Sequence, residues 1–300
     1  MVSRSTILYR EFMRRSVIYN GEGCEGYLRI DYGERPRHAE GLRGVMVDIG
    51  FSKMMGGFSV DSVRDYASYV AQAVGEYGGC CRVVFVIPDN WDFRRNTKLA
   101  RAMLTGLRGL VSQGDLDPAR AVPILVVHTA IDVPGGLEAL IDLANEYKSL
   151  FGTAYLGFSM RVNPTLVSGV VKPIQCVRDP NHCVSRFLNY VMAVREVGGD
   201  WPWFLLGVNR RVLKPLSRLG PPIGIQGVVG DTDNSGLVPN NLVRRIMNAL
   251  AAKAGREVRG RGFFKTTIID RCLVFHVWKY NELPEELIRK FGIDPITDYF

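Results

Sequence analysis

The sequence predicts an α/β fold, a (β/α)8 TIM-like barrel with a small basic C-terminal extension. From residue 44 onward, short apolar runs suited to buried strands alternate with segments whose apolar residues have helical spacing. Polar or glycine-rich loops follow these runs, which is typical of parallel strands joined by right-handed helical crossovers. A doubly wound open sheet is the alternative, but no Gly-x-Gly-x-x-Gly follows the first of these strands.

The predicted elements can be justified in chain order. Val45-Met46-Val47, ending at Asp48, has the β-branched content of a strand buried on both faces. The next segment has one apolar helical face, with Asp61 near its start and Gly78-Gly79 at its end. On the same grounds we expect strands at 44–48, 82–87, 122–127, 153–156, 203–206 and 223–229, and helices at 60–77, 97–112, 137–151, 184–197 and 212–219. The irregular stretch 160–182 leaves room for one more short strand near 170–177.

The pattern changes at about residue 240. Residues 1–240 are assigned to the barrel, with 1–40 as a lead-in that supplies its first strand. Beyond it we expect a helix at 242–254, strands at 263–269 and 273–278, and a closing helix at 285–291. Residues 241–300 either complete the barrel or form a small appended α+β unit.

Composition and charge indicate a cytoplasmic protein with a polyanionic partner. No apolar run approaches the roughly 20 residues of a membrane span, and the first residues do not resemble a secretory signal. Lys and Arg number 38 against 30 Asp and Glu, a net charge of +8. We therefore predict a nucleic-acid-binding surface in the basic segment that holds Arg244, Arg245, Arg256, Arg259 and Arg261, although a solvated helix face has the same composition.

The cysteines point to neither a metal site nor a disulfide framework. The six residues, Cys24, Cys80, Cys81, Cys176, Cys183 and Cys272, include no Cys-x-x-Cys. Cys176, His182 and Cys183 fit no common zinc spacing. We expect buried or incidental thiols in a reducing compartment, with no metal and no cofactor.

Polar side chains follow most of the predicted strands. Because the carboxyl ends of barrel strands meet at one face, these residues are expected to converge there. Two carboxylates in one pocket permit acid–base work together with a nucleophile, and an anion stabilises the oxocarbenium-like transition state of glycosidic-bond chemistry. The alternative is a set of helix caps and solvated loop ends. The residues are Asp48, Asp89, His128, Ser159, Asn209, Asp231 and Asp233.

Several of these strand ends carry short motifs whose order matches a known family. They are Val-Met-Val-Asp48-Ile-Gly-Phe-Ser, Val-Ile-Pro-Asp89-Asn-Trp, Val-Pro-Ile-Leu-Val-Val-His128, Tyr-Leu-Gly157-Phe-Ser, Phe-Leu-Leu-Gly207 and Gly-Asp231-Thr-Asp233-Asn-Ser. In that order they resemble strand ends of tRNA-guanine transglycosylases and their DNA-modifying relatives. The first motif resembles a degraded form of the family's Asp-Ser-Gly-Gly-Phe, and the last resembles the segment that carries the nucleophilic aspartate. The resemblance spans about Gly44 to Ser235.

The resemblance implies an enzyme that replaces guanine in a polynucleotide, tRNA or DNA, with a 7-deazaguanine. It implies that Asp233, or else Asp231, attacks C1′ and holds a covalent intermediate, while Asp48 takes a proton from the incoming base. Asp89 would bind the guanine edge and Phe51 would stack on the base. The implied substrate-binding set is Phe51, Ser52, Asp89, His128, Gly157 and Gly207.

The departures from the family pattern leave other readings open. Ile49 and Gly50 replace Ser-Gly-Gly, and His128 stands where an amide reads the base. The family's Cys-x-Cys-x-x-Cys…His zinc site is missing, which places the resemblance with the divergent, zinc-free branch. A second reading is a catalytically silent barrel that binds nucleic acid or pairs with a second copy or an active subunit. A third is a barrel that acts on a small phosphorylated or glycosidic metabolite, which salt-dependent nucleic-acid binding would distinguish from the others.

Overall fold

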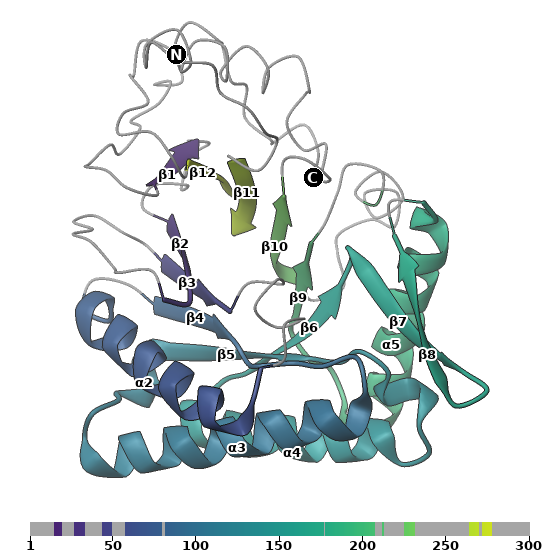
Figure 1. Ribbon diagram of the computed structural model, residues 1–300, viewed down its shortest axis with the longest axis horizontal. Coiled ribbons are helices and arrows are strands. Elements are labelled where there is room, and N and C mark those ends of the chain that lie inside the picture. Colours follow the sequence, from purple (N-terminus) through teal and green to yellow (C-terminus); the bar gives the residue numbers. More distant parts are fainter. Residues whose placement is uncertain are drawn as a thin grey trace, which may run out of the picture.

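The fold is organised around one curled, ten-stranded sheet, seen in a computed structural model (Figure 1). The structure describes residues 15–19, 27–33, 44–49, 58–79, 82–176, 178–207, 212, 225–231, 264–269 and 272–277. The sheet order is β1-β12-β11-β10-β9-β6-β5-β4-β3-β2. Its strands are β1 (Arg15–Tyr19), β2 (Tyr27–Asp31), β3 (Gly44–Asp48), β4 (Arg82–Val86), β5 (Ala121–Val126), β6 (Tyr155–Ser159), β9 (Trp203–Leu206), β10 (Ile225–Asp231), β11 (Phe264–Ile269) and β12 (Cys272–Val277).

Most of the sheet is parallel, as predicted. From β2 to β10 each neighbouring pair runs parallel, whereas β10–β11, β11–β12 and β12–β1 are antiparallel. The sheet curls until β1 and β12 lie close to β2. The predicted strands at 263–269 and 273–278 are therefore confirmed with small shifts, and they extend the same sheet.

The α-helices of the described ranges lie outside the curl and cover its outer face (Figure 1). They are α2 (Val60–Tyr77), α3 (Phe93–Gln113), α4 (Gly136–Phe151) and α5 (Pro180–Gly198). In three of them a side chain caps the first turn: Ser59 accepts from the Ser62 amide, Asp92 from Arg95 and Asp179 from His182. The caps explain why α3 and α5 begin four residues before the predicted starts at 97 and 184.

Alternation along the strands creates two apolar clusters, one on each face of the sheet. The larger cluster joins the sheet to the helices and includes Val45, Val47 and Phe85. The smaller cluster lines the inner face of the curl. It consists of Met46, Val86, Ile124, Val126 and Phe204, all at most 5% exposed. Strands buried on both faces account for the uninterrupted apolar runs in the sequence.

The irregular stretch 160–182 holds a hairpin that projects from the main sheet (Figure 1). Its strands, β7 (Val162–Val167) and β8 (Val170–Gln175), pair antiparallel in a sheet of their own. The sequence predicted only one short strand there. The hairpin is attached to the body of the fold by Asp132, which accepts from the Leu166 amide and forms an ion pair with Arg186 at 2.5 Å.

The expectation of free thiols is wrong for two of the six cysteines. Cys176, just after β8, forms a disulfide with Cys183 in the first turn of α5, and both are fully buried. The spacing did not indicate this bond. The two cysteines are brought together by the fold, where the amides of Arg178 and Asp179 donate to the Gln175 carbonyl. Among the described residues, no group of three or more His, Cys, Asp or Glu side chains is arranged to hold a metal.

Other predictions are confirmed or lie beyond the described ranges. The strands at 44–48 and 203–206 and the helix at 60–77 match to the residue. The lead-in supplies β1 and also β2, the parallel neighbour of β3. The helices expected at 242–254 and 285–291 lie outside the described residues, as does that at 212–219 apart from Val212. No helix within the described ranges combines the length and apolarity that crossing a bilayer requires.

Candidate functional site

A buried carboxylate–imidazole pair lies at the carboxyl ends of β4 and β5. Asp89 follows β4 by three residues and His128 follows β5 by two. Their side chains are in direct contact, Asp89 Oδ2 with His128 Nε2, and the two residues are only 6% and 4% exposed. Burial of two polar side chains is costly unless they are paired, so the contact explains how both can lie here. Two residues that the strand-end pattern had singled out separately thus form one unit.

The pair leaves one ring nitrogen unsatisfied. If His128 is neutral and donates its Nε2 proton to the Asp89 carboxylate, Nδ1 keeps a lone pair. Nδ1 is buried and has no hydrogen-bond partner in the part of the chain that the structure describes. An unpaired buried nitrogen is costly and is a natural contact for a bound polar group. A carboxylate that fixes an imidazole in this way also prepares it for proton transfer.

The backbone of His128 is held in an uncommon conformation. Its φ of 36° is positive, which is rare for a residue other than glycine. The Tyr190 hydroxyl, from α5, donates to the His128 carbonyl and accepts from the Ile131 amide at 3.2 Å. Such backbone strain persists only where surrounding contacts fix it, and it is frequent at functional sites. Burial raises the pKa of Tyr190 above its ordinary value, so the hydroxyl stays protonated and able to donate.

Two further contacts fasten the loop that carries Asp89 to the loop that carries His128. Asn96, only 2% exposed, donates to the Val126 carbonyl at 2.9 Å and accepts from the Asn90 amide at 3.0 Å. Thr129 donates from its hydroxyl to the Trp91 carbonyl at 2.8 Å. Both contacts cross from one strand end to the next, so they fix the relative positions of Asp89 and His128.

Asp48 lies beside this pair on the neighbouring strand. It is the last residue of β3, is half-buried, and follows Met46 by two positions on the inner face. Its carbonyl accepts from the Tyr32 amide at 2.7 Å, which fixes the strand end. Ser159, the last residue of β6, alternates onto the same inner face. Neighbouring strands are about 4.8 Å apart, so the ends of β3, β4 and β5 span about 10 Å.

The two glycines predicted to bind substrate have structural reasons to be glycine. Gly157 lies inside β6 and not in the loop after it, because β6 extends to Ser159. A Cβ at Gly157 would lie 2.8 Å from Ile124 Cγ2, so glycine allows β5 and β6 to pack closely. Gly207 has a φ of +69°, and a Cβ there would lie 2.4 Å from Arg161 Cβ. Their contact with a base stays a prediction.

The remaining predicted residues are placed only in part. Asp231 is the last residue of β10 and pairs with Lys265 on β11, so it ends a strand and does not open a loop as predicted. Phe51, Ser52, Asp233, Arg244, Arg245, Arg256, Arg259 and Arg261 lie outside the described residues. The structure thus joins Asp89 to His128 and sets Asp48 on the adjacent strand.

Comparisons with known proteins do not assign this chain to a family. No protein-family model matches the chain. No curated protein matches it. Among solved structures, it is similar to an aldo-keto reductase of Bombyx mori in complex with NADP, with a TM-score of 0.37 and 11% identity over 71% of this chain and 72% of that chain. A likeness this remote carries no argument about function.

Proposed function

We propose that the carboxyl face of the curled sheet is the active centre of a base-exchange enzyme. In this proposal it replaces guanine in a polynucleotide with a 7-deazaguanine, as the resemblance to tRNA-guanine transglycosylases implies. The observation that carries the proposal is the buried Asp89–His128 pair at the carboxyl ends of β4 and β5, with Asp48 at the end of the adjacent strand β3. Buried, mutually paired ionisable groups at the ends of parallel strands are typical of catalytic sites.

The proposed reaction passes through a covalent intermediate. A carboxylate oxygen of Asp233 forms a bond to C1′ of the target nucleotide while the bond from C1′ to N9 of guanine breaks. Asp48 gives a proton to the departing guanine and takes one back from the incoming base. The nitrogen of that base then attacks C1′ and releases the Asp233 carboxylate. No oxidant, reductant or cofactor enters this balance.

The Asp89–His128 pair has a binding role in this scheme. His128 Nδ1, the buried nitrogen without a described partner, would contact a polar edge of the purine. Asp89 would hold the imidazole in the tautomer that presents this nitrogen. This modifies the direct contact between Asp89 and guanine that the resemblance implies, because one Asp89 oxygen already contacts His128.

The proposal also extends to the architecture and the setting. The curl of the sheet, with β1 and β12 close to β2, supports a TIM-like barrel that closes around the inner face. A cytoplasmic location would give the enzyme access to tRNA or DNA. The buried Cys176–Cys183 disulfide counts against that location, because disulfides are rare in a reducing cytosol.

Incorporation of labelled base tests the proposal. The protein is incubated with labelled guanine or a labelled 7-deazaguanine and with mixed RNA and DNA acceptors, and the products are separated on denaturing gels. Wild type should incorporate label and Asp233→Asn should not. Asp48→Asn should slow incorporation by about 100-fold or more, the usual range for loss of an acid–base group. His128→Ala should raise KM for the base, because it removes a binding contact. If Asp231→Asn is inactive and Asp233→Asn is active, the mechanism stands with Asp231 as the nucleophile.

The catalytically silent reading has one observation in its favour. His128 occupies the place of the base-reading amide and engages Asp89, so the site departs from the family's polar set. A protein that binds RNA or DNA in a salt-dependent way but never incorporates any base would support this second candidate and refute the first. Absence of both binding and incorporation would favour a small-metabolite substrate.

A further inference from the structure

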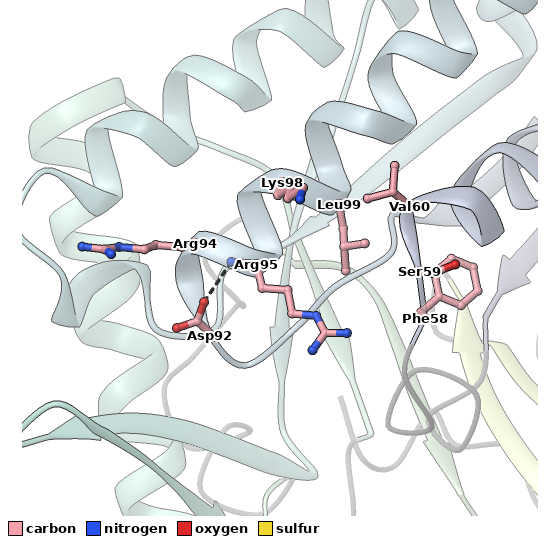
Figure 2. A pocket seen from close by; sticks show the side chains of 8 residues that line it. All are labelled: Phe58, Ser59, Val60, Asp92, Arg94, Arg95, Lys98 and Leu99. Carbon is pink, nitrogen blue, oxygen red and sulfur yellow. Dashed lines mark hydrogen bonds between the residues drawn. The ribbon is translucent and has the colours of Figure 1, made fainter.

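A cationic cavity lies between the first turns of α2 and α3, at the same end of the sheet as the proposed active centre. Its volume is about 440 Å³. Phe58, Ser59 and Leu99 form part of its lining on one side, and Asp92, Arg95 and Lys98 border it on the other (Figure 2). Phe58 and Leu99 are 7% and 3% exposed, so the cavity has an apolar floor. Cations at the edge of an apolar floor attract an anion more strongly than the same cations would in open solvent.

Within the described residues, no ion pair balances the positive charge of this cavity. Arg94, Arg95 and Lys98 are all exposed, and none forms an ion pair in the part of the chain that the structure describes. On the same helix, by contrast, Arg101 and Arg108 both pair with Glu146, at 3.6 and 3.0 Å. α3 therefore begins with unpaired cations and continues with paired ones.

Among the described lining residues, the carboxylate is that of Asp92, which also caps α3. Asp92 accepts from the Arg95 amide at 2.9 Å, which caps α3. Ser59 caps α2 in the same way through the Ser62 amide. Because side chains of the protein already occupy both helix ends, the attraction for an anion comes from the cationic side chains and the cavity. Figure 2 shows Arg95 extending toward Phe58, whereas Arg94 extends to the opposite side.

The cavity is on the catalytic side of the sheet. The first turns of α2 and α3 follow the carboxyl ends of β3 and β4, which also carry Asp48 and Asp89. Asp92 is three residues after Asp89, and Asn96, between Arg95 and Lys98 in α3, anchors the same loop to β5. A group bound in the cavity would therefore lie at the same end of the sheet as a group bound at His128.

We propose that this cavity binds a phosphate group of the substrate, with Arg95 and Lys98 as its charged contacts. The anion site stands on the cavity and its charges; only the source of the phosphate rests on the proposed function. If that function is right, the phosphate is a backbone phosphodiester that flanks the target nucleotide. A phosphate monoester on a small nucleotide offers the same chemistry, and the experiment separates the two.

The test measures binding of three probes to the full-length protein: a fluorescent single-stranded RNA 12-mer, guanosine 5′-monophosphate and inorganic phosphate. The variant is the double substitution Arg95→Gln/Lys98→Gln. Arg101→Gln is the matched control, because it removes the same kind of charge from the same helix outside the cavity. All three residues are exposed, so the variants should keep the wild-type stability within about 0.5 kcal/mol.

We expect the double variant to bind the 12-mer at least tenfold more weakly at low salt. The slope of log affinity against log salt should become shallower by about 0.7 per lost phosphate contact, while Arg101→Gln changes neither quantity. A loss confined to the 12-mer identifies a backbone phosphodiester, and a loss for the monophosphate or inorganic phosphate identifies a terminal phosphate.

Three results would overturn the proposal: no probe binds wild type, the double variant binds all probes as wild type does, or Arg101→Gln weakens binding equally. The outcome is distinct from that of the base-exchange assay. Weakened binding without any base incorporation would leave the phosphate site standing and the proposed function refuted. If the double variant changes neither incorporation nor binding, the proposed function stands and the phosphate site is refuted.

Discussion

The hydroxyl of Tyr190 on α5 donates a hydrogen bond to the carbonyl of His128, 62 residues earlier in the chain. This contact joins the outer helix layer to the strand end that carries the candidate site. His128 has a φ of 36°, the least common backbone conformation among the site residues, and the hydrogen bond from Tyr190 supports this conformation. We therefore expect Tyr190 to be a positioning residue that affects a bound group only through His128.

Replacing Tyr190 by phenylalanine should loosen His128. The substitution leaves the His128 carbonyl and the Ile131 amide without their partner, so we expect a loss of about 1–3 kcal/mol in the free energy of unfolding. Urea denaturation measures the loss, and the ring resonances of His128 should broaden or shift. Tyr147→Phe is the control, because its hydroxyl bonds to the Ala100 carbonyl between α3 and α4. Equal shifts of the His128 resonances in both variants would show that Tyr190 has no positioning role.

Asn96 should be more important than its place in a helix suggests. Asn96→Ala removes the bonds to Asn90 and Val126 together, so we expect a cost of about 2 kcal/mol or more and a weakened Asp89–His128 contact. The shift of the urea midpoint at constant m-value measures the stability change. Thr97→Ala, at the next position, is the control. Its hydroxyl only bonds back to the Phe93 carbonyl four residues earlier, a contact that contributes little. Equal losses in the two variants would contradict this prediction.

The Asp132–Arg186 pair should hold the β7–β8 hairpin on the fold. Asp132 and Arg186 side chains are 16% and 13% exposed, so Arg186→Met leaves a half-buried carboxylate unpaired and should cost about 1–3 kcal/mol. We expect faster tryptic cleavage at the exposed Lys172. The matched control, Arg195→Met on the same helix, breaks an exposed pair with Asp200 and should cost under 1 kcal/mol. Unchanged cleavage at Lys172 in the Arg186 variant would mean that other contacts hold the hairpin.

The elements predicted best are those whose signals are local. The helix α2 has a serine cap, one continuous apolar face and Gly78-Gly79 at its end, so its bounds follow from neighbouring residues alone. The start of α3 was predicted four residues too late. Its cap, Asp92, lies in a stretch whose sequence looks like a continuous loop. Only one of the two strands of the β7–β8 hairpin was predicted. Pro164 and Pro173 obscure its strands, and the two residues that attach it, Asp132 and Arg186, lie far apart in the sequence.

The candidate site was predictable as a set of residues and not as a geometry. Asp89 and His128 were identified because polar residues at strand ends converge in a parallel sheet. Their direct contact depends on two loops 39 residues apart in sequence, and no local pattern specifies it. Asn96 and Tyr190 were missed because each looks like an ordinary helix residue. Only the fold brings Asn96 into contact with Val126 and Tyr190 into contact with His128.

Two buried tyrosines should make the fold sensitive to alkaline pH. Burial raises the pKa of Tyr147 and of Tyr190 above the ordinary value of 10.0. In the unfolded chain both ionise near pH 10, whereas in the folded protein they keep their protons. The unfolded state therefore binds fewer protons above pH 10, and linkage requires the free energy of unfolding to fall as pH rises. The stabilising contribution is complete below pH 10, and each tyrosine adds a slope of at most about 1.4 kcal/mol per pH unit above it.

Urea denaturation between pH 9 and pH 11.5 measures this slope. The double variant Tyr147→Phe/Tyr190→Phe should be less stable at pH 9, because it lacks their hydrogen bonds, and yet decline less steeply above pH 10. Parallel curves for wild type and variant would show that these two hydroxyls are not held protonated in the folded protein.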